Sequence, residues 1–266
     1  MIVASRFERD QRRPNVGWAI GIVAVMAVTA AFWPSIEGTA SLDDVIQDLP
    51  ATLQALIGAQ HGVSLGAPAG YLNARLFATI LPVLLTVYGV GRGARALAGS
   101  EEDGTLELIL ANPVTRTRVA VERGLAAFAF LLALGGLAFL ALVALGAPVG
   151  LLDGVSVTRV LAACGGLTVL AAFHAAIAFA VGAATGRHGL AVAAAATVAV
   201  AGYLLAGLLA TSADLRWLQA ISPWHWLLTR NVLVEGTPTL PLLVEVVIGA
   251  ALAAAGIQRF TSRDLR

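Results

Sequence analysis

The sequence contains no lysine, and all 17 residues of the lysine and arginine class are arginines. A P-loop ATPase needs a lysine on the β- and γ-phosphates, so this chain does not carry such a site. A Schiff-base enzyme is excluded for the same reason, because its nucleophile is a lysine amine. The single cysteine, Cys164, excludes an internal disulfide and any Cys-x-x-Cys metal or redox pair.

Charge of either sign is also scarce, because charged residues make up 12% of the 266 residues, against about 25% in a soluble protein. Six apolar runs hold a single charged side chain, that of Glu245. The runs cover residues 16–33, 76–91, 124–146, 160–185, 190–211 and 240–257. A helix of about 20 apolar residues crosses a bilayer, and no other open structure satisfies the backbone there. The sequence therefore predicts an all-α, polytopic membrane protein of one domain with six transmembrane helices, the second of which starts near Tyr71.

The first apolar run follows several arginines and could instead be the core of a signal peptide, with residues 28–30 as its cleavage site. Its 18 apolar residues exceed the usual 7–15 of a signal peptide. Trp18 and Trp33 lie at its two ends, where aromatic residues anchor a transmembrane helix in the membrane interface. We therefore expect a retained span.

The distribution of arginines predicts the orientation in the membrane. If the N-terminus is inside, 13 of the arginines lie in cytoplasmic segments. The external segments then hold four, namely Arg75, Arg159, Arg216 and Arg230. The positive-inside rule accordingly places both termini in the cytoplasm. We expect a multi-pass protein of the cell (plasma) membrane.

Two of the predicted external segments are too apolar for plain linkers. Residues 41–58 begin with Ser41 and two aspartates, as a helix N-terminus does, and continue with apolar residues at helical spacing. They favour an interfacial helix, although a helix that merely connects two spans fits as well. Residues 213–235 contain three tryptophans and are divided by Ser222-Pro223. They favour a re-entrant hairpin, although the tryptophans could simply anchor the neighbouring spans.

The predicted cytoplasmic segment 99–118 carries acids, a short amphipathic pattern and then bases. Residues 101–110 read EEDGTLELIL, and Asn112-Pro113 ends the helical pattern because a residue before proline avoids the helical conformation. Arginines lead into the third span. A short helix at the surface between acids and bases suits the docking of a soluble partner, whereas the alternative is an ordinary charged loop.

Three stretches carry a family resemblance: residues 101–116 read EEDGTLELILANPVTR, residues 222–226 read SPWHW, and residues 260–265 read FTSRDL. The first resembles the E-x-x-G-T-L-E-L-L-L-x-x-P-V-S-R stretch of type-2 ABC transporter permeases. The second is similar to the Ser-Pro-aromatic part of that family's external re-entrant region, and the third to its C-terminal F-x-x-R-D-L. Six spans with both ends inside match the family over the whole chain.

The resemblance implies the membrane-spanning permease subunit of an ATP-driven ABC exporter. Its implied partners are two separate ATP-binding cassette subunits and a second permease, either a copy or a paralogue. ATP and Mg would be bound by the partner ATPases, so we expect neither a cofactor nor a catalytic residue in this chain. The family's coupling helix corresponds to Glu101, Glu102, Gly104, Thr105, Leu106, Glu107, Pro113 and Arg116. Its external re-entrant region corresponds to Ser222, Pro223, Trp224 and Trp226.

Two polar residues inside the predicted spans are candidates for the substrate path, since ionisable groups in a membrane usually face the bundle interior or water. Glu245 lies near the outer end of the last span, where it could instead reach the interface or pair with Arg230. His174 lies near the centre of the fourth span, where it could instead bond to a neighbouring helix. The rival to the exporter is a self-contained secondary transporter or channel in which these two residues relay protons or ions.

Several other functions lack support in the sequence. The four histidines fall in four different segments, so we expect no metal site. The hydrolase motifs H-E-x-x-H and G-x-S-x-G are absent. A net charge of +1 gives no indication of a nucleic-acid partner. A membrane anchor without a transport path is a third interpretation. The short outer segments favour drugs, lipids or ions over bulky polymers as the substrate.

Overall fold

The computed structural model describes residues 11–37, 49–50, 53, 64–208, 219, 221–228 and 230–263. Within these residues the chain forms helices and no strand. Six helices are long and apolar enough to cross a membrane: Arg12–Ser35, Pro68–Glu102, Arg116–Val149, Val157–Thr185, His188–Ala206 and Thr239–Ser262. The predicted fold class, an all-α membrane protein with six spanning helices, is confirmed. The predicted interfacial helix over residues 41–58 lies outside the described residues, apart from residues 49–50 and 53.

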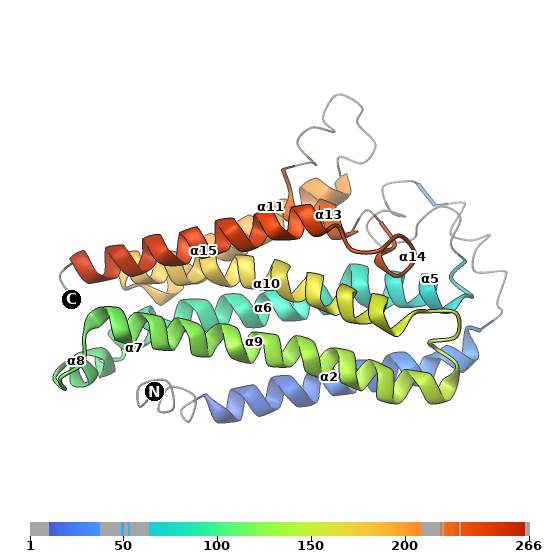
Figure 1. Ribbon diagram of the computed structural model, residues 1–266, viewed down its shortest axis with the longest axis horizontal. Coiled ribbons are helices and arrows are strands. Elements are labelled where there is room, and N and C mark those ends of the chain that lie inside the picture. Colours follow the sequence, from blue (N-terminus) through green and yellow to red (C-terminus); the bar gives the residue numbers. More distant parts are fainter. Residues whose placement is uncertain are drawn as a thin grey trace.

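The central helix of the bundle is α10 (Val157–Thr185). It packs against α6 (Leu81–Ala94), α9 (Arg116–Gly146), α11 (His188–Leu208) and α15 (Thr239–Ser262), as Figure 1 shows. Small residues allow these close contacts. A Cβ atom on Gly93 of α6 would lie 2.2 Å from the carbonyl oxygen of Ala175, and one on Gly256 of α15 would lie 2.7 Å from the Cα atom of Ala180. Glycine at these two positions brings both helices against α10.

The second spanning helix is continuous but not uniform. It begins with α5 (Pro68–Leu72), widens into a π-helical stretch at Asn73–Ile80, and continues as α6. A second π-helical stretch, Arg95–Gly99, leads into α7 (Ser100–Glu102). The first widened stretch lies just before Pro82, which has no N–H to continue the helical hydrogen bonding. A single long helix thus connects the two ends of the bundle.

One end of the bundle, the α8 end, gathers several segments that are far apart in the sequence. It holds α7, the short helix α8 (Thr105–Leu110), the start of α2 (Arg12–Phe32) and the end of α15 (Figure 1). Gly104 has φ +66°, a left-handed conformation that favours glycine, and this turn sets the direction of α8. Thr115 then caps α9, because its Oγ1 accepts a hydrogen bond from the Arg118 N–H at 3.2 Å. The helix α9 therefore begins at Arg116, eight residues before the apolar run that it contains.

The opposite end carries the short helices α13 (Pro223–Leu228) and α14 (Val232–Glu235). Ser222-Pro223 marks the start of α13. Residues 209–218, which include most of the segment before it, lie outside the described part of the chain, so the re-entrant hairpin stays a prediction. The Arg159 guanidinium at the start of α10 donates to the carbonyl oxygens of Leu233 at 3.1 Å and Val234 at 2.8 Å. Asn231 donates to the Ala69 carbonyl oxygen at 3.2 Å, which ties this region to α5.

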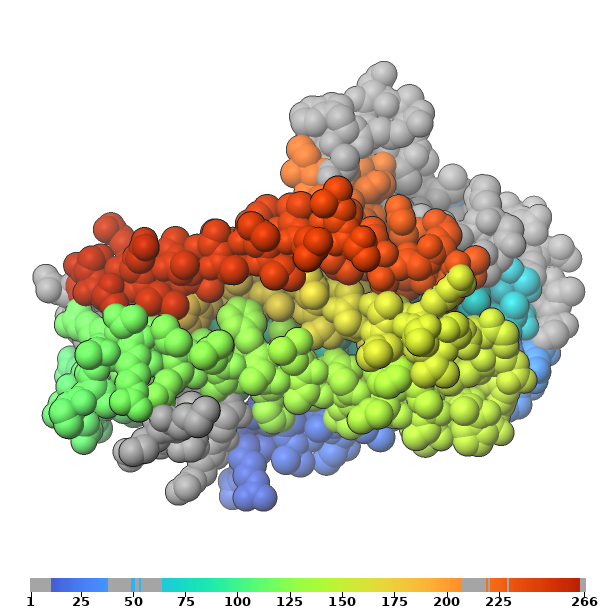
Figure 2. All heavy atoms as spheres, in the orientation of Figure 1, coloured from blue at the N-terminus to red at the C-terminus, as the bar shows by residue number. Residues whose placement is uncertain are grey.

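The helix α15 forms an outer wall of the bundle and lies along its surface over its whole length (Figure 2). Its outer face is apolar, with the side chains of Leu240, Leu243 and Val247 largely exposed. Exposed apolar surface of this extent is stable in contact with lipid chains and unfavourable in water. This face is therefore suited to the bilayer.

Candidate functional site

The segment that the sequence predicts to couple with a partner, residues 99–118, projects from the α8 end. Its short helix α8 is amphipathic in a way that the sequence alone did not resolve. Leu106 is only 1% exposed and packs with Leu97, Val119 and Phe260. Leu108 is 72% exposed. Of the four apolar residues of this helix, Leu106, Leu108, Ile109 and Leu110, only Leu108 is thus largely exposed, and Ile109 and Leu110 are half-buried.

The acidic residues before and within α8 differ in their contacts. Glu102, Asp103 and Glu107 are exposed. Glu101 forms an ion pair with Arg263, and the exposed Glu102 carboxylate accepts a hydrogen bond from the His188 N–H at 2.8 Å. The position of Glu101 suits an internal framework for α8 more than a surface for a partner.

The remaining residues of the predicted coupling set support the shape of this segment. Gly104 forms the left-handed turn described above, and Pro113 is exposed in the turn after α8. The Thr105 hydroxyl donates to the Ser100 carbonyl oxygen at 3.2 Å. Arg116 donates to the Arg263 carbonyl oxygen at 2.7 Å. We call the exposed side chains of Asp103, Glu107 and Leu108 the docking face, and the exposed residues Glu102, Thr105 and Pro113 lie near it in the chain.

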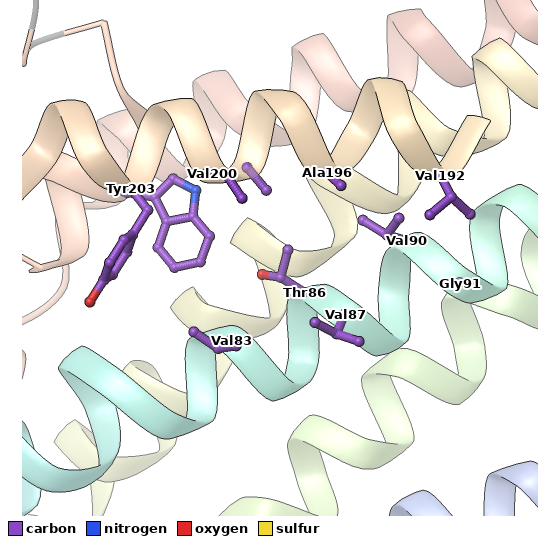
Figure 3. A pocket seen from close by; sticks show the side chains of 11 residues that line it. Val83, Thr86, Val87, Val90, Gly91, Val192, Ala196, Val200 and Tyr203 are labelled. Carbon is purple, nitrogen blue, oxygen red and sulfur yellow. The ribbon is translucent and has the colours of Figure 1, made fainter. Parts of the chain in front are cut away.

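A groove between α6 and α11 is the second candidate site, and the sequence did not indicate it. Its volume is about 400 Å³, within the usual range of ligand pockets. Figure 3 shows side chains of the two helices facing each other across it. The lining residues, which are almost all apolar, are Val83, Thr86, Val87, Val90, Gly91, Val192, Ala196, Ala199, Val200, Tyr203 and Trp224.

Two polar atoms of this groove are buried without a hydrogen-bond partner among the described residues, the Thr86 hydroxyl and the Trp224 indole N–H. Both atoms are enclosed by the surrounding helices, so they add little polarity to the open wall of the groove. No charged residue lines the groove in the part of the chain that the structure describes. The groove therefore suits an uncharged, largely apolar molecule.

The predicted re-entrant residues lie at one end of this groove. The Ser222 hydroxyl donates to the Gly202 carbonyl oxygen of α11 at 2.7 Å. Trp224 packs so closely on Gly202 that a Cβ atom there would lie 2.9 Å from the indole ring. Pro223 begins α13 and Trp226 is half-buried outside the groove. Ser222 and Trp224 thus join α13 to α11.

His225 is the titratable neighbour of Trp224 in α13. Burial, and to a smaller extent the charge of Arg230, lowers the pKa of its imidazole. The side chain is therefore neutral at pH 7, and this end of the groove gains no positive charge from it.

His174 is completely buried in α10, next to Trp224, with their ring centroids 5.7 Å apart. Its Nδ1 donates to the Leu170 carbonyl oxygen at 2.8 Å. This partner lies one turn earlier in the same helix, and the described residues show no hydrogen bond from His174 to a neighbouring helix. The Nε2 atom has no hydrogen-bond partner within the described chain. His174 does not line the groove, whereas its neighbour Trp224 does, and its assignment to a substrate path stays a prediction.

Glu245 is 1% exposed and lies on α15. Residues one turn away on either side contact α10: Leu242 lies near Gly166, and Gly249 lies near Phe173. Both carboxylate oxygens lack a hydrogen-bond partner in the described residues, so the expected pairing with Arg230 is absent there. Its burial favours a position inside the bundle over one in which the side chain reaches the interface. Glu245 does not line the groove, and its assignment to a substrate path stays a prediction.

The described residues contain no group of three histidine, cysteine or acidic side chains that could hold a metal ion. The two candidate sites are therefore the docking face on α8 and the apolar groove. The helix that carries α6 joins them, because it lines the groove and continues through α7 toward α8.

The sequence of the chain matches a known protein family. A family described as the multidrug efflux system permease Rv1217c, C-terminal domain, matches residues 7–261 of the chain. The match covers the first five long helices and all but the last residue of the sixth. No curated protein matches the chain.

Proposed function

We propose that this chain, which belongs to the family of the multidrug efflux system permease Rv1217c, C-terminal domain, is the membrane-spanning subunit of an ATP-driven exporter of type-2 ABC architecture. The family match and the helical bundle establish a multi-pass permease of an efflux system. The finer part of the proposal, the coupling to ATP, rests on one observation. An exposed face on α8 is held rigidly at the end of a helix that lines an apolar groove.

The docking face suits a soluble partner for chemical reasons. Leu108 offers an apolar anchor, and Asp103 and Glu107 place negative charge beside it. Apolar anchors surrounded by charge give a small interface both affinity and orientation. Since the chain has no lysine for nucleotide phosphates, the ATP and Mg would be bound by two partner ATPases.

The structure of the second spanning helix suggests how the partner would act on the groove. Nucleotide-driven closure of the ATPases would displace α8 as a rigid body. The displacement would pass through α7 into α6, since the helix is continuous over Pro68–Glu102. The side chains of Val83, Thr86 and Val90 would then move relative to α11. A second permease, either a copy or a paralogue, would complete the transport path.

The substrate class follows from the lining of the groove. Its almost entirely apolar walls favour a hydrophobic molecule. A charged ligand would lose its hydration without gaining an ionic partner. We therefore propose uncharged, drug-sized hydrophobic compounds as substrates.

Co-purification tests the docking step. The double variant Glu107→Arg/Leu108→Ser should lose the ATPase, because it removes the apolar anchor and reverses a charge. Asp153→Arg is the matched control, since Asp153 is an exposed acid in the connection between α9 and α10, at the other end of the bundle. Equal recovery of the ATPase with both variants would contradict the proposal.

A self-contained secondary transporter is the alternative, and the buried, unpartnered carboxylate of Glu245 is the observation in its favour. Such groups inside a membrane bind protons or ions in many transporters. Transport by the chain without any ATPase, lost in Glu245→Gln, would support this alternative.

A further inference from the structure

A bidentate ion pair connects the end of α15 to the residues before α8. Arg263, directly after α15, donates through Nη1 to Glu101 Oε1 at 2.7 Å and through Nη2 to Oε2 of the same carboxylate. The side chains of Arg263 and Glu101 are 14% and 5% exposed. The planar guanidinium and the carboxylate each present two parallel contacts, so this pair fixes orientation as well as distance.

Arg263 also contacts a third element, the end of α10, which leads into the turn before α11. Its Nε atom donates to the Ala183 carbonyl oxygen in the last turn of α10 at 2.9 Å. The Glu101 carboxylate covers Gly186 in that turn, where a Cβ atom would lie 2.5 Å from Oε1. Gly186 has φ +69°, so both the conformation and the space at this position favour glycine.

Two further hydrogen bonds join the same three elements. Arg116 donates to the main-chain oxygen of Arg263 at 2.7 Å, and Glu102 accepts from the His188 N–H at the start of α11 at 2.8 Å. Three segments are thus connected to one another: the end of α15, the end of α10 with the turn before α11, and the residues around α8. Each of the three contacts the other two. We call the five residues Glu101, Glu102, Arg116, His188 and Arg263 the latch.

The burial of the ion pair indicates that it fixes the relative orientation of the helix ends more than it stabilises the fold. Taking both charges out of water offsets most of their attraction, and a hydrophobic pair of similar size often stabilises a fold as well. A hydrophobic pair would not fix the relative orientation of three helix ends. Elsewhere on α15, Gly249 and Gly256 lie against α10, and these are apolar contacts without a fixed hydrogen-bond direction.

We propose that Arg263 is a positioning residue for coupling: it holds the end of α15 and the α10–α11 turn to α8, so that these elements move as one unit. The inference rests on the proposed function, in which α8 receives the movement of an ATPase. Without the latch, the movement would reach α6 through α7, and it would reach α9 and α15 only through the apolar contacts of Leu106 with Val119 and Phe260. With the latch, the movement also reaches α11, the other wall of the groove, and the end of α15 follows it in a fixed orientation.

Spin labels on the isolated chain test the rigid connection without any partner. Cys164 is the single cysteine, so Cys164→Ala provides a background for labels at Asp103→Cys and Gln258→Cys, both exposed positions. The parent background should give one narrow distance distribution, and Arg263→Gln should broaden it. Arg259→Gln is the matched control, since Arg259 is an exposed arginine one turn earlier in α15. An unchanged distribution in Arg263→Gln would overturn the proposal.

Transport per ATP hydrolysed, measured on the purified complex with its ATPase, tests the consequence. Arg263→Gln and the uncharged pair Glu101→Gln/Arg263→Gln should keep the ATPase bound, because Glu107 and Leu108 are unchanged. Their transport per ATP should fall roughly fivefold or more, the usual size of a coupling between sites. Arg263→Lys should fall between these variants and the parent, since it keeps the charge and loses the fork.

The failure of this inference is distinguishable from that of the proposed function. If the parent chain recruits no ATPase, the proposed function fails. The latch is tested separately by the spin labels, and a distance distribution as narrow in Arg263→Gln as in the parent would overturn it. If the ATPase binds and the uncharged pair transports as much per ATP as the parent, the latch does not couple, while the exporter assignment stands.

Discussion

Replacing Gly93 by alanine should separate the two helices at the centre of the bundle. The new Cβ atom would lie 2.2 Å from the carbonyl oxygen of Ala175, whereas an ordinary contact between carbon and oxygen is about 3.3 Å. The oxygen is part of the α10 backbone, so it cannot turn away as a side chain would. The two helices therefore have to separate by about 1 Å.

The magnitude follows from comparing this variant with Gly91→Ala on the same helix. A Cβ atom on Gly91 has no neighbour within 4 Å. Both changes gain about 1 kcal/mol because alanine favours a helix over glycine, so this gain cancels in the comparison. Overpacking remains, and it destabilises by about 1–3 kcal/mol or more.

Thermal unfolding in detergent measures this difference. Each kcal/mol shifts the midpoint by about 2–4 °C in a protein of this length, so Gly93→Ala should unfold several degrees below Gly91→Ala. Membrane insertion should be equal, because both variants remain apolar. If Gly93→Ala is as stable as Gly91→Ala, then α6 and α10 do not approach as closely as described, and the account of the groove beside them fails.

Three further predictions concern single residues. Gly104→Val should reduce ATPase binding and destabilise the chain by about 1–2 kcal/mol, because valine is strained at φ +66°. The control Gly154→Val, at φ +73° in the connection between α9 and α10, should lose the same stability and keep ATPase binding. Equal binding in both variants would contradict the role of Gly104. Ala196→Phe should fill the groove and lower transport at constant protein level, whereas Ala193→Phe on the outer face of α11 should leave transport unchanged. Uptake of a lipophilic dye into vesicles measures the transport of both variants. Equal uptake would count against the groove as the binding site. Glu245→Gln should preserve or raise the temperature midpoint of unfolding, since the carboxylate that it replaces has no hydrogen-bond partner in the described chain. If the variant folds normally and loses ATP-driven transport, Glu245 lies on the substrate path.

The six helices could be predicted from the sequence because the bilayer excludes charge so strongly. Only Glu245 interrupts the apolar runs, and each run lies within a long helix apart from the last residues of the fifth, which are outside the described part. The ends were less predictable. The helix α9 begins at Arg116 because Thr115 caps it, and a hydropathy profile does not detect such a cap.

The candidate sites were harder to predict because they depend on pairings between distant residues. Glu101 was assigned to a partner interface from its neighbours in the sequence, but its ion pair with Arg263 lies 162 positions away. The groove was not predicted because Val87 and Ala196 are residue types that also face lipid. Periodicity identifies an apolar helix face and does not show which other helix covers it.

Transport by the reconstituted chain with and without its ATPase tests the central claim most directly. Vesicles would contain the purified permease, a lipophilic fluorescent dye and either ATP or an imposed proton gradient. The account predicts dye transport only when both the ATPase and ATP are present, and its loss in Glu107→Arg/Leu108→Ser but not in Asp153→Arg. Dye movement driven by the proton gradient through the permease alone would contradict it.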